Sequence, residues 1–238
     1  MMQFKKVFIF GYGSRGRLVV KGMNQHHLRV TIIESDANKY QLAKDDGYLD
    51  VLLVDVTADS QLSELNISDE DHIVCVMDDE HLNVFLTLSL RSLYRQATIY
   101  SISNSLDSNQ KLKMAGANRV IDLYEVSAKR IHNTLNRPIA TKLLDGFLSD
   151  SSKISFKEII IPHASPLQGR LASEINYRAY GILPIGISNA LNSASFTFAT
   201  SIESKVISTG DTIICMGEDD NLESFEQKIE NMESIKWK

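Results

Sequence analysis

The stretch Val7-Phe8-Ile9-Phe10-Gly11-Tyr12-Gly13-Ser14-Arg15-Gly16 decides the fold of this chain. Its four apolar residues predict a buried β-strand, and its glycines have the spacing G-x-G-x-x-G. The residues after them predict a helix over Ser14–Asn24. A glycine loop that joins a strand directly to a helix is the context in which this pattern cradles phosphates. The alternative is a glycine turn without a ligand.

Each glycine of the loop has a distinct predicted task. Gly11 permits the tight turn, Gly13 lets the backbone approach a pyrophosphate, and Gly16 lets the helix pack close to the strand. The free N–H groups at the start of the helix then point at phosphate oxygens. The predicted cofactor-binding loop therefore consists of Gly11, Tyr12, Gly13, Ser14, Arg15 and Gly16.

Carboxylates after the next two strands are candidates for the rest of a nucleotide. Glu34 ends the second predicted strand, where an acidic side chain accepts hydrogen bonds from ribose hydroxyls and repels a 2′-phosphate. Asp36 is a possible substitute for Glu34, although a helix N-cap is the favoured interpretation of this residue. Asp55, after the third strand, either reaches the adenine edge or is an ordinary loop carboxylate.

A third acidic group, Asp78-Asp79-Glu80, follows the fourth predicted strand. Asp78 is a further candidate for contact with the cofactor. Asp79 and Glu80 fall in the first turn of a predicted helix, where negative charge is stabilised by the helix dipole. The alternative role for these two residues is a cation site, because clustered carboxylates suit hard cations.

Apolar strands alternate with helices through the first half of the chain. Such continuous apolar strands indicate a parallel sheet that is covered on both faces, so we expect a Rossmann-like, doubly wound α/β fold. The predicted strands are Val7–Phe10, Val30–Ile33, Val51–Val54, Ile73–Met77, Thr98–Ile102 and Arg119–Ile121.

The second half has a different construction, and it holds all four prolines of the chain. Two helices are expected over Tyr124–Leu148, with Pro138 opening the second, and Ser149–Ser152 is a polar break. A smaller α+β domain follows. Its predicted strands are Ser155–Ile161, Ile182–Ser188, Ser204–Ile207 and Thr212–Met216, and its predicted helices are Leu171–Ala179 and Asn221–Met232. The expected domains are a nucleotide-binding lobe at 1–122, crossover helices with a linker at 123–152, and a C-terminal subdomain at 153–238.

Composition narrows the class of protein. The 238 residues are 43% hydrophobic and 23% charged, which is an ordinary globular balance. The net charge of −5 argues against nucleic acid as a partner. Apolar stretches fall short of the ~20 residues that cross a bilayer, and the start of the chain does not resemble a signal peptide. Cys75 and Cys215 lie in apolar runs, so we expect buried, reduced thiols in a cytoplasmic protein.

A dehydrogenase also needs an acid, base or nucleophile placed against its cofactor. The sequence lacks H-E-x-x-H, G-x-S-x-G, C-x-x-C and P-loop patterns, and its histidines are scattered. The sequence predicts nucleotide binding but shows no motif that would catalyse a reaction of the nucleotide. This combination favours a sensor over an enzyme. The alternatives are a small NAD-dependent oxidoreductase with an unrecognised site, or an assembly module whose cleft is vestigial.

Further motifs follow the glycine loop and Glu34 in a fixed order. Asp55-Val56-Thr57 follows the third strand, and Asp79–Asn83 opens the apolar helix with an acidic-x-x-Asn pattern. Leu112–Ile121 reads Leu-x-x-x-Gly-Ala-x-x-Val-Ile, and Leu135–Pro138 fits a crossover helix. The motifs of the last third are Ser165–Arg170, which reads Ser-Pro-Leu-x-Gly-Arg, then Gly181–Ile187, then Gly210–Gly217.

In this order the motifs resemble the RCK domains, also called KTN domains, which regulate potassium channels and Trk/Ktr-type transporters. The resemblance covers nearly the whole chain, including the C-terminal RCK subdomain. The chain departs from the family in three places. Val54 stands where glycine is common, Ser14 stands where arginine is common, and Ser101–Ser103 lacks the Ala-Arg that often ends the fifth strand.

The resemblance implies a function and a set of partners. It implies a ligand-sensing regulator of potassium flux in which two lobes pair through crossover helices and the homodimers form an octameric ring. It implies NAD(H) or an adenine nucleotide such as ATP or ADP as ligand, with a divalent cation as a further candidate. It also implies a cytoplasmic location on the inner face of the membrane, through a channel or transporter pore or through an N-terminal transmembrane segment missing from this sequence.

Overall fold

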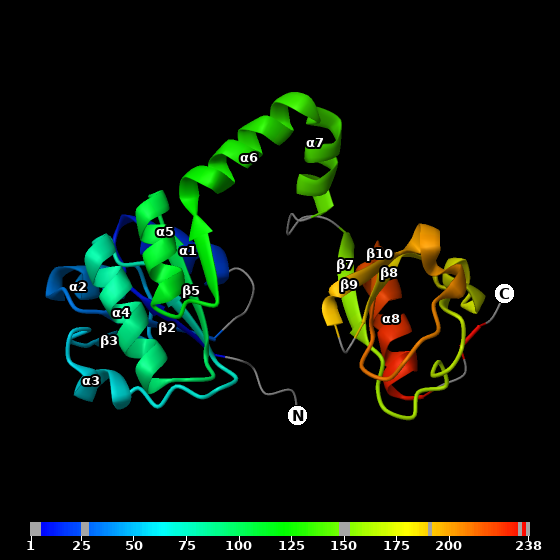
Figure 1. Ribbon diagram of the computed structural model, residues 1–238, viewed down its shortest axis with the longest axis horizontal. Helices are drawn as coiled ribbons and strands as arrows, with labels where there is room; N and C mark the ends of the chain where they lie inside the picture. The colour runs from blue at the N-terminus through cyan, green and yellow to red at the C-terminus, as the bar shows by residue number, and fades with distance from the viewer. Residues whose placement is uncertain (1–5, 25–28, 148–152, 190–191, 233–234, 237–238) are drawn as a thin grey trace. The chain divides into compact units, whose positions relative to one another are not determined.

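The computed structural model describes residues 6–24, 29–147, 153–189, 192–232 and 235–236. The chain divides into two compact units, Met1–His132 and Asn133–Lys238. Each unit is described by itself (Figure 1).

The first unit is built on a six-stranded parallel sheet with the strand order β3-β2-β1-β4-β5-β6. The order reverses between β1 and β4, so the loops after these two strands flank a topological switch point. The strands are β1 (Lys6–Phe10), β2 (Arg29–Glu34), β3 (Val51–Leu53), β4 (His72–Cys75), β5 (Thr98–Ser103) and β6 (Arg119–Asp122).

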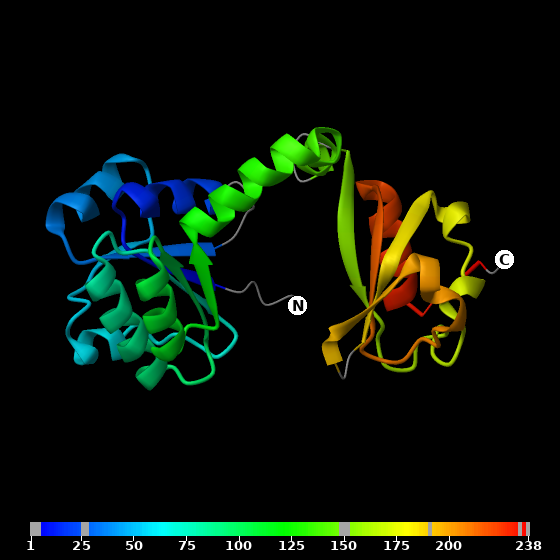
Figure 2. The same cartoon turned by 45° about the horizontal axis from the view of Figure 1, so that its top comes forward.

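Helices cover both faces of this sheet, as the two views of the first unit show (Figures 1 and 2). On one face Val20 and Ala43, from α1 and α2, pack against Ile9 and Ile32. On the other, α3 and α4 bury apolar side chains against Phe8 and the remaining strands. The helices are α1 (Ser14–Asn24), α2 (Ala37–Asp45), α3 (Asp59–Ser63), α4 (Glu80–Leu93) and α5 (Leu106–Met114).

This architecture confirms the predicted fold class. The six predicted strands and the predicted helix at Ser14–Asn24 agree with the structure to within two residues at each end. The five-residue helix α3 was not predicted, because it buries a single residue, Leu62, and so has no apolar periodicity. Cys75 and Cys215 are buried and free, as expected.

Two helices follow the sheet. They are α6 (Leu123–Asn136) and α7 (Pro138–Phe147), and Pro138 opens the second as predicted. The boundary between the two units falls inside α6. The predicted break at Ser149–Ser152 lies outside the described residues. No helix of the described residues is long and apolar enough to cross a membrane.

The second unit contains a four-stranded antiparallel sheet with the order β7-β10-β8-β9. One face is covered by α8 (Asp219–Glu230), which buries Leu222, Phe225 and Ile229. The strands are β7 (Ile154–Ile160), β8 (Ile182–Asn189), β9 (Asn192–Phe198) and β10 (Thr212–Glu218). The unit is thus the small α+β domain that the sequence predicts.

Two predicted elements of this unit are wrong. Leu171–Ala179 is two short 3₁₀ helices, Ala172–Glu174 and Tyr177–Tyr180, because Ile175 and Asn176 take non-helical backbone angles. Ser204–Ile207 is not a strand. A 3₁₀ helix, Ala199–Ser204, runs into it, and only Val206 pairs, through an isolated bridge to Leu171.

Candidate functional site

The glycine loop between β1 and α1 is held by the strand beside it. Gly11 has a φ of +107°, which favours glycine, and its N–H donates to the Ile33 carbonyl of β2 at 2.8 Å. Gly16 brings α1 close to this turn, because a Cβ at Gly16 would overlap the Gly11 carbonyl oxygen. The loop therefore has the tight turn and the close helix packing that the motif predicts.

Glu34 is joined to the loop by hydrogen bonds. Its Oε2 accepts from the backbone N–H of Tyr12 at 2.7 Å, and its Oε1 accepts from the N–H groups of Ser35 at 2.8 Å and Asp36 at 3.0 Å. The side chain is 1% exposed. The Ser35 hydroxyl also donates to Oε1, at the longer distance of 3.5 Å. Because a carboxylate offers about four acceptor positions, a ribose hydroxyl at the end of β2 would take the place of this long bond. Contact between Glu34 and a ribose stays a prediction.

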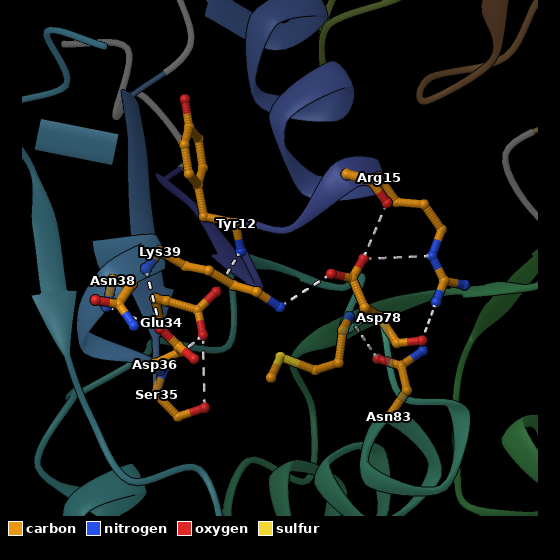
Figure 3. A network of polar contacts seen from close by, with 11 residues as sticks. Tyr12, Arg15, Glu34, Ser35, Asp36, Asn38, Lys39, Asp78 and Asn83 are labelled. Carbon is orange, nitrogen blue, oxygen red and sulfur yellow. Dashed lines mark hydrogen bonds and ion pairs between the residues drawn. The ribbon is translucent and has the colours of Figure 1, made fainter. Parts of the chain in front are cut away.

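Tyr12 contributes its backbone rather than its ring to this site. Figure 3 shows the ring pointing away from Glu34. The phenol donates to Asp46 Oδ2 at 2.7 Å, and the ring packs edge-on against Tyr48. Burial and the Asp46 hydrogen bond raise the pKa of the Tyr12 phenol. The ring thus anchors the loop to the core beside α2.

Asp78 lies across the loop from Glu34, at the end of the segment that follows β4 (Figure 3). Its carboxylate accepts from Lys39 Nζ at 3.0 Å and from Ser14 Oγ at 3.3 Å. The Arg15 guanidinium donates to the Asp78 backbone carbonyl. Burial alone raises the pKa of Asp78, but Lys39, Arg15 and Ser14 outweigh it, so the pKa lies below its usual range.

Lys39 is a site residue that the sequence analysis missed. It lies in the first turn of α2, and its ammonium group crosses the opening of the loop to reach Asp78. The Asp78 hydrogen bond raises the pKa of Lys39. A basic residue one turn into the helix after β2 was the available signal. Asp36 is the N-cap of that helix, as favoured, and accepts from the N–H groups of Asn38 and Lys39.

The remaining acidic candidates serve local structure in their described contacts. Asp55 accepts from the N–H and hydroxyl of Thr57 at 2.9 and 2.6 Å. Asp79 is the N-cap of α4 and accepts from Leu82 N–H, while Glu80 accepts from hydroxyls at the start of α5. Within the part of the chain that the structure describes, no group of three or more His, Cys, Asp or Glu could hold a metal ion.

The side chain of Asn83 connects α4 to the strand ends that lie beside the glycine loop. Its Oδ1 accepts from Met77 N–H at 3.2 Å, and its Nδ2 donates to the carbonyls of Cys75 at 3.3 Å and Ile102 at 3.1 Å. This buried amide thus fastens α4 to the ends of β4 and β5, and it fixes the segment that carries Asp78.

The doubly wound sheet and the glycine loop at its switch point define the first unit as a Rossmann-like domain of the nucleotide-binding class. More particularly, residues 7–123 match the family model of the TrkA-N domain. The first unit is therefore similar to TrkA-N domains over nearly its whole length.

Comparison with known proteins extends the similarity over nearly the whole chain. "Potassium channel protein 1" of Methanocaldococcus jannaschii is 24% identical over 226 residues, which are 94% of this chain and 67% of that protein. The chain thus spans about two thirds of the length of this curated relative.

Two solved structures show the fold. The human SLO3 gating ring matches 92% of this chain and 46% of its own, with a TM-score of 0.64 and 10% identity. The NAD(P)-binding domain of an exopolyphosphatase-related protein from Archaeoglobus fulgidus matches 56% of this chain and 98% of its own, with a TM-score of 0.50 and 18% identity.

Proposed function

We propose that this chain is a cytoplasmic, ligand-sensing regulatory domain or subunit that controls potassium flux through a membrane channel or transporter. The proposal rests on the match to the TrkA-N domain, which includes a glycine loop of the phosphate-binding type. The chain is also related to a potassium channel protein over 94% of its length. The role is regulation rather than catalysis. Within this proposal, residues 1–122 form the nucleotide lobe, 123–152 the crossover and linker, and 153–238 the C-terminal RCK subdomain.

The proposed ligand is NAD(H) or an adenine nucleotide such as ATP or ADP. The N–H groups of the Gly11–Gly16 loop bind its phosphates, and Glu34 accepts from its ribose hydroxyls. Asp55 is the proposed neighbour of the adenine, since Val54 N–H pairs with the Glu34 carbonyl at the same edge of the sheet. We leave a divalent cation out of the proposal, because the described contacts of Asp79 and Glu80 are at helix starts.

The ligand is tested by titrating NADH, NADPH, NAD and ADP into the purified chain in a calorimeter. NADH and NADPH differ only in the 2′-phosphate, so they form a matched pair. We expect NADPH to bind at least about tenfold more weakly than NADH, because its phosphate meets the buried Glu34 carboxylate. Equal affinities would remove Glu34 from the ribose position, and binding of no nucleotide would support an assembly module with a vestigial cleft. Sustained NADH turnover with added oxidants would favour the oxidoreductase.

For dimerisation, the proposed partner is a second copy of the chain. No residue of α6 is buried in the single chain, although the helix carries large apolar side chains. Exposed large apolar side chains of this kind are typical of an interface. The exposed apolar residues of α6 and α7 are Tyr124, Val126, Ile131, Leu135, Ile139, Leu143 and Leu144. We propose that these helices form the homodimer, and that the dimers assemble into an octameric ring that acts on the pore.

A charge within this apolar surface tests the dimer. Ile139 is 84% exposed in the single chain. We expect Ile139→Asp to weaken dimerisation by about a hundredfold, because each copy then buries a charge in place of an apolar side chain. Sedimentation velocity over a concentration series measures the change. The matched control is Leu49→Asp, at a site 93% exposed and outside these helices, which should leave the dimer intact. A dimer unchanged by Ile139→Asp would contradict the proposed interface.

Coupling of the ligand to the pore requires only that the ligand binds one state of the ring more tightly than the other. Such couplings are typically about 1–3 kcal/mol. A potassium-flux assay with vesicles that contain the pore protein, with and without this chain and its ligand, measures the effect. Flux that is independent of both would contradict the proposed role.

A further inference from the structure

The Asp78 carboxylate lies directly on the middle glycine of the loop. A Cβ built on Gly13 would overlap the Asp78 carboxyl group, with Oδ1 2.5 Å away. Gly13 is the residue whose missing side chain lets a pyrophosphate approach the backbone. In the described structure this space beside Gly13 therefore holds a carboxylate from the neighbouring strand end.

The groups around this carboxylate are those that bind phosphates. Lys39 Nζ lies 3.0 Å from Oδ2, Ser14 Oγ lies 3.3 Å from Oδ1, and Arg15 Nε lies 3.8 Å from Oδ1. Ser14 and Arg15 also belong to the first turn of α1, where the helix dipole favours a negative charge. Two cationic side chains and a hydroxyl, from two different segments, thus converge on one anionic group (Figure 3).

Carboxylate and phosphate are both anions that accept several hydrogen bonds, so they compete for the same donors. They cannot share this place, because the Asp78 carboxyl group fills the space against Gly13 and because two negative charges at contact distance repel each other. Binding of a phosphate at the loop therefore requires that the Asp78 side chain leaves Lys39 and Gly13.

We propose that Asp78 is an internal competitor for the ligand: its carboxylate occupies the phosphate position beside Gly13, and a nucleotide phosphate replaces it on Lys39 and Arg15. This inference rests on the proposed nucleotide function of the loop. It assigns Lys39 as a phosphate-binding residue, and it makes the movement of Asp78 part of ligand sensing. Asp79, the next residue, is the N-cap of α4, so Asp78 lies directly before the start of a core helix.

Neutral replacements of Asp78 test the competition. Asp78→Asn keeps the size of the side chain and removes its charge, whereas Asp78→Ser removes both. If Asp78 closes the phosphate position about nine tenths of the time before nucleotide is added, then both variants should bind ADP and NADH about tenfold more tightly than the parent chain. Lys39→Gln should weaken binding of the same nucleotides in the parent and in the Asp78→Ser background. Calorimetric titration measures all of these affinities, and thermal unfolding establishes that each variant is folded.

The matched control is Asp107→Asn, which removes another carboxylate paired with a lysine, here Lys111 at 2.6 Å on α5. Its affinities should equal those of the parent chain. Parent-like or weaker binding by both folded Asp78 variants would overturn the competition while leaving nucleotide binding in place. An absence of nucleotide binding in the parent and in Asp78→Ser would instead overturn the nucleotide site, and the competition with it.

Discussion

Gly16→Ala is expected to lower the free energy of unfolding by about 3 kcal/mol, as overpacking against a rigid neighbour does. The new Cβ would overlap the Gly11 carbonyl oxygen and would lie 2.8 Å from the Gly11 carbonyl carbon. These are backbone atoms of a turn whose N–H is bonded to β2, so they cannot rotate away as a side chain can. Relief requires α1 to move off the sheet, which also opens the packing of Val20. Urea unfolding followed by circular dichroism measures the loss.

The control for this variant lies in the same helix. Gly22 is also in α1, but a Cβ added there meets nothing within 4 Å. Gly22→Ala should therefore raise the free energy of unfolding by about 0.5–1 kcal/mol, because alanine is the better helix former. If both alanine variants stabilise the chain, then the contact between α1 and the glycine turn is not what keeps Gly16 small.

The first half of the fold was predictable because its central strands β1, β2 and β4 are buried on both faces. For this reason Val7–Phe10 is a continuous apolar run and Val30–Ile33 is apolar except for the buried Thr31, which is the pattern expected of a parallel sheet. The Gly11–Gly16 loop then fixes the point at which the chain leaves β1. The helix α3, which was not predicted, contributes only Leu62 to the core.

The second unit was harder to predict because its elements do not follow a single periodicity. β9 is an edge strand, and at its end, where the side chains are described, Phe196 and Phe198 are exposed rather than buried. Val206-Ile207 has strand-forming residues, yet its length allows one bridge and one buried side chain. β-branched residues therefore marked a core contact here and not a strand.

Features of the site also differ in whether neighbouring residues in the sequence determine them or the tertiary structure does. The N-cap at Asp36 and the turn at Gly11 depend on neighbours in the sequence, and local patterns predicted both. The contact of Lys39 with Asp78 joins residues from α2 and from the end of β4, and it depends on the strand order of the sheet. A single sequence does not specify which of its charged side chains meet across such a switch point.

The second large effect is expected at Asn83, where Asn83→Leu should lower the free energy of unfolding by about 3 kcal/mol. Leucine has a similar size, so the loss comes from hydrogen bonding and not from a cavity. The change leaves three buried backbone groups without their partner, namely Met77 N–H and the carbonyls of Cys75 and Ile102. An unsatisfied buried group costs about 1–3 kcal/mol, although relaxation and ordered water recover part of the total.

The control is Asn38→Leu, which changes an exposed asparagine in the first unit and should alter stability by no more than about 0.5 kcal/mol. Urea unfolding compares the two variants, and nucleotide titration of folded Asn83→Leu adds a second readout. Because Asn83 holds the Met77 N–H beside Asp78, loss of this amide should also change the affinity of the loop for ADP. A variant as stable as the parent chain would mean that the ends of β4 and β5 are held without the amide, and the Asn of the acidic-x-x-Asn pattern would then require a role in ligand contact.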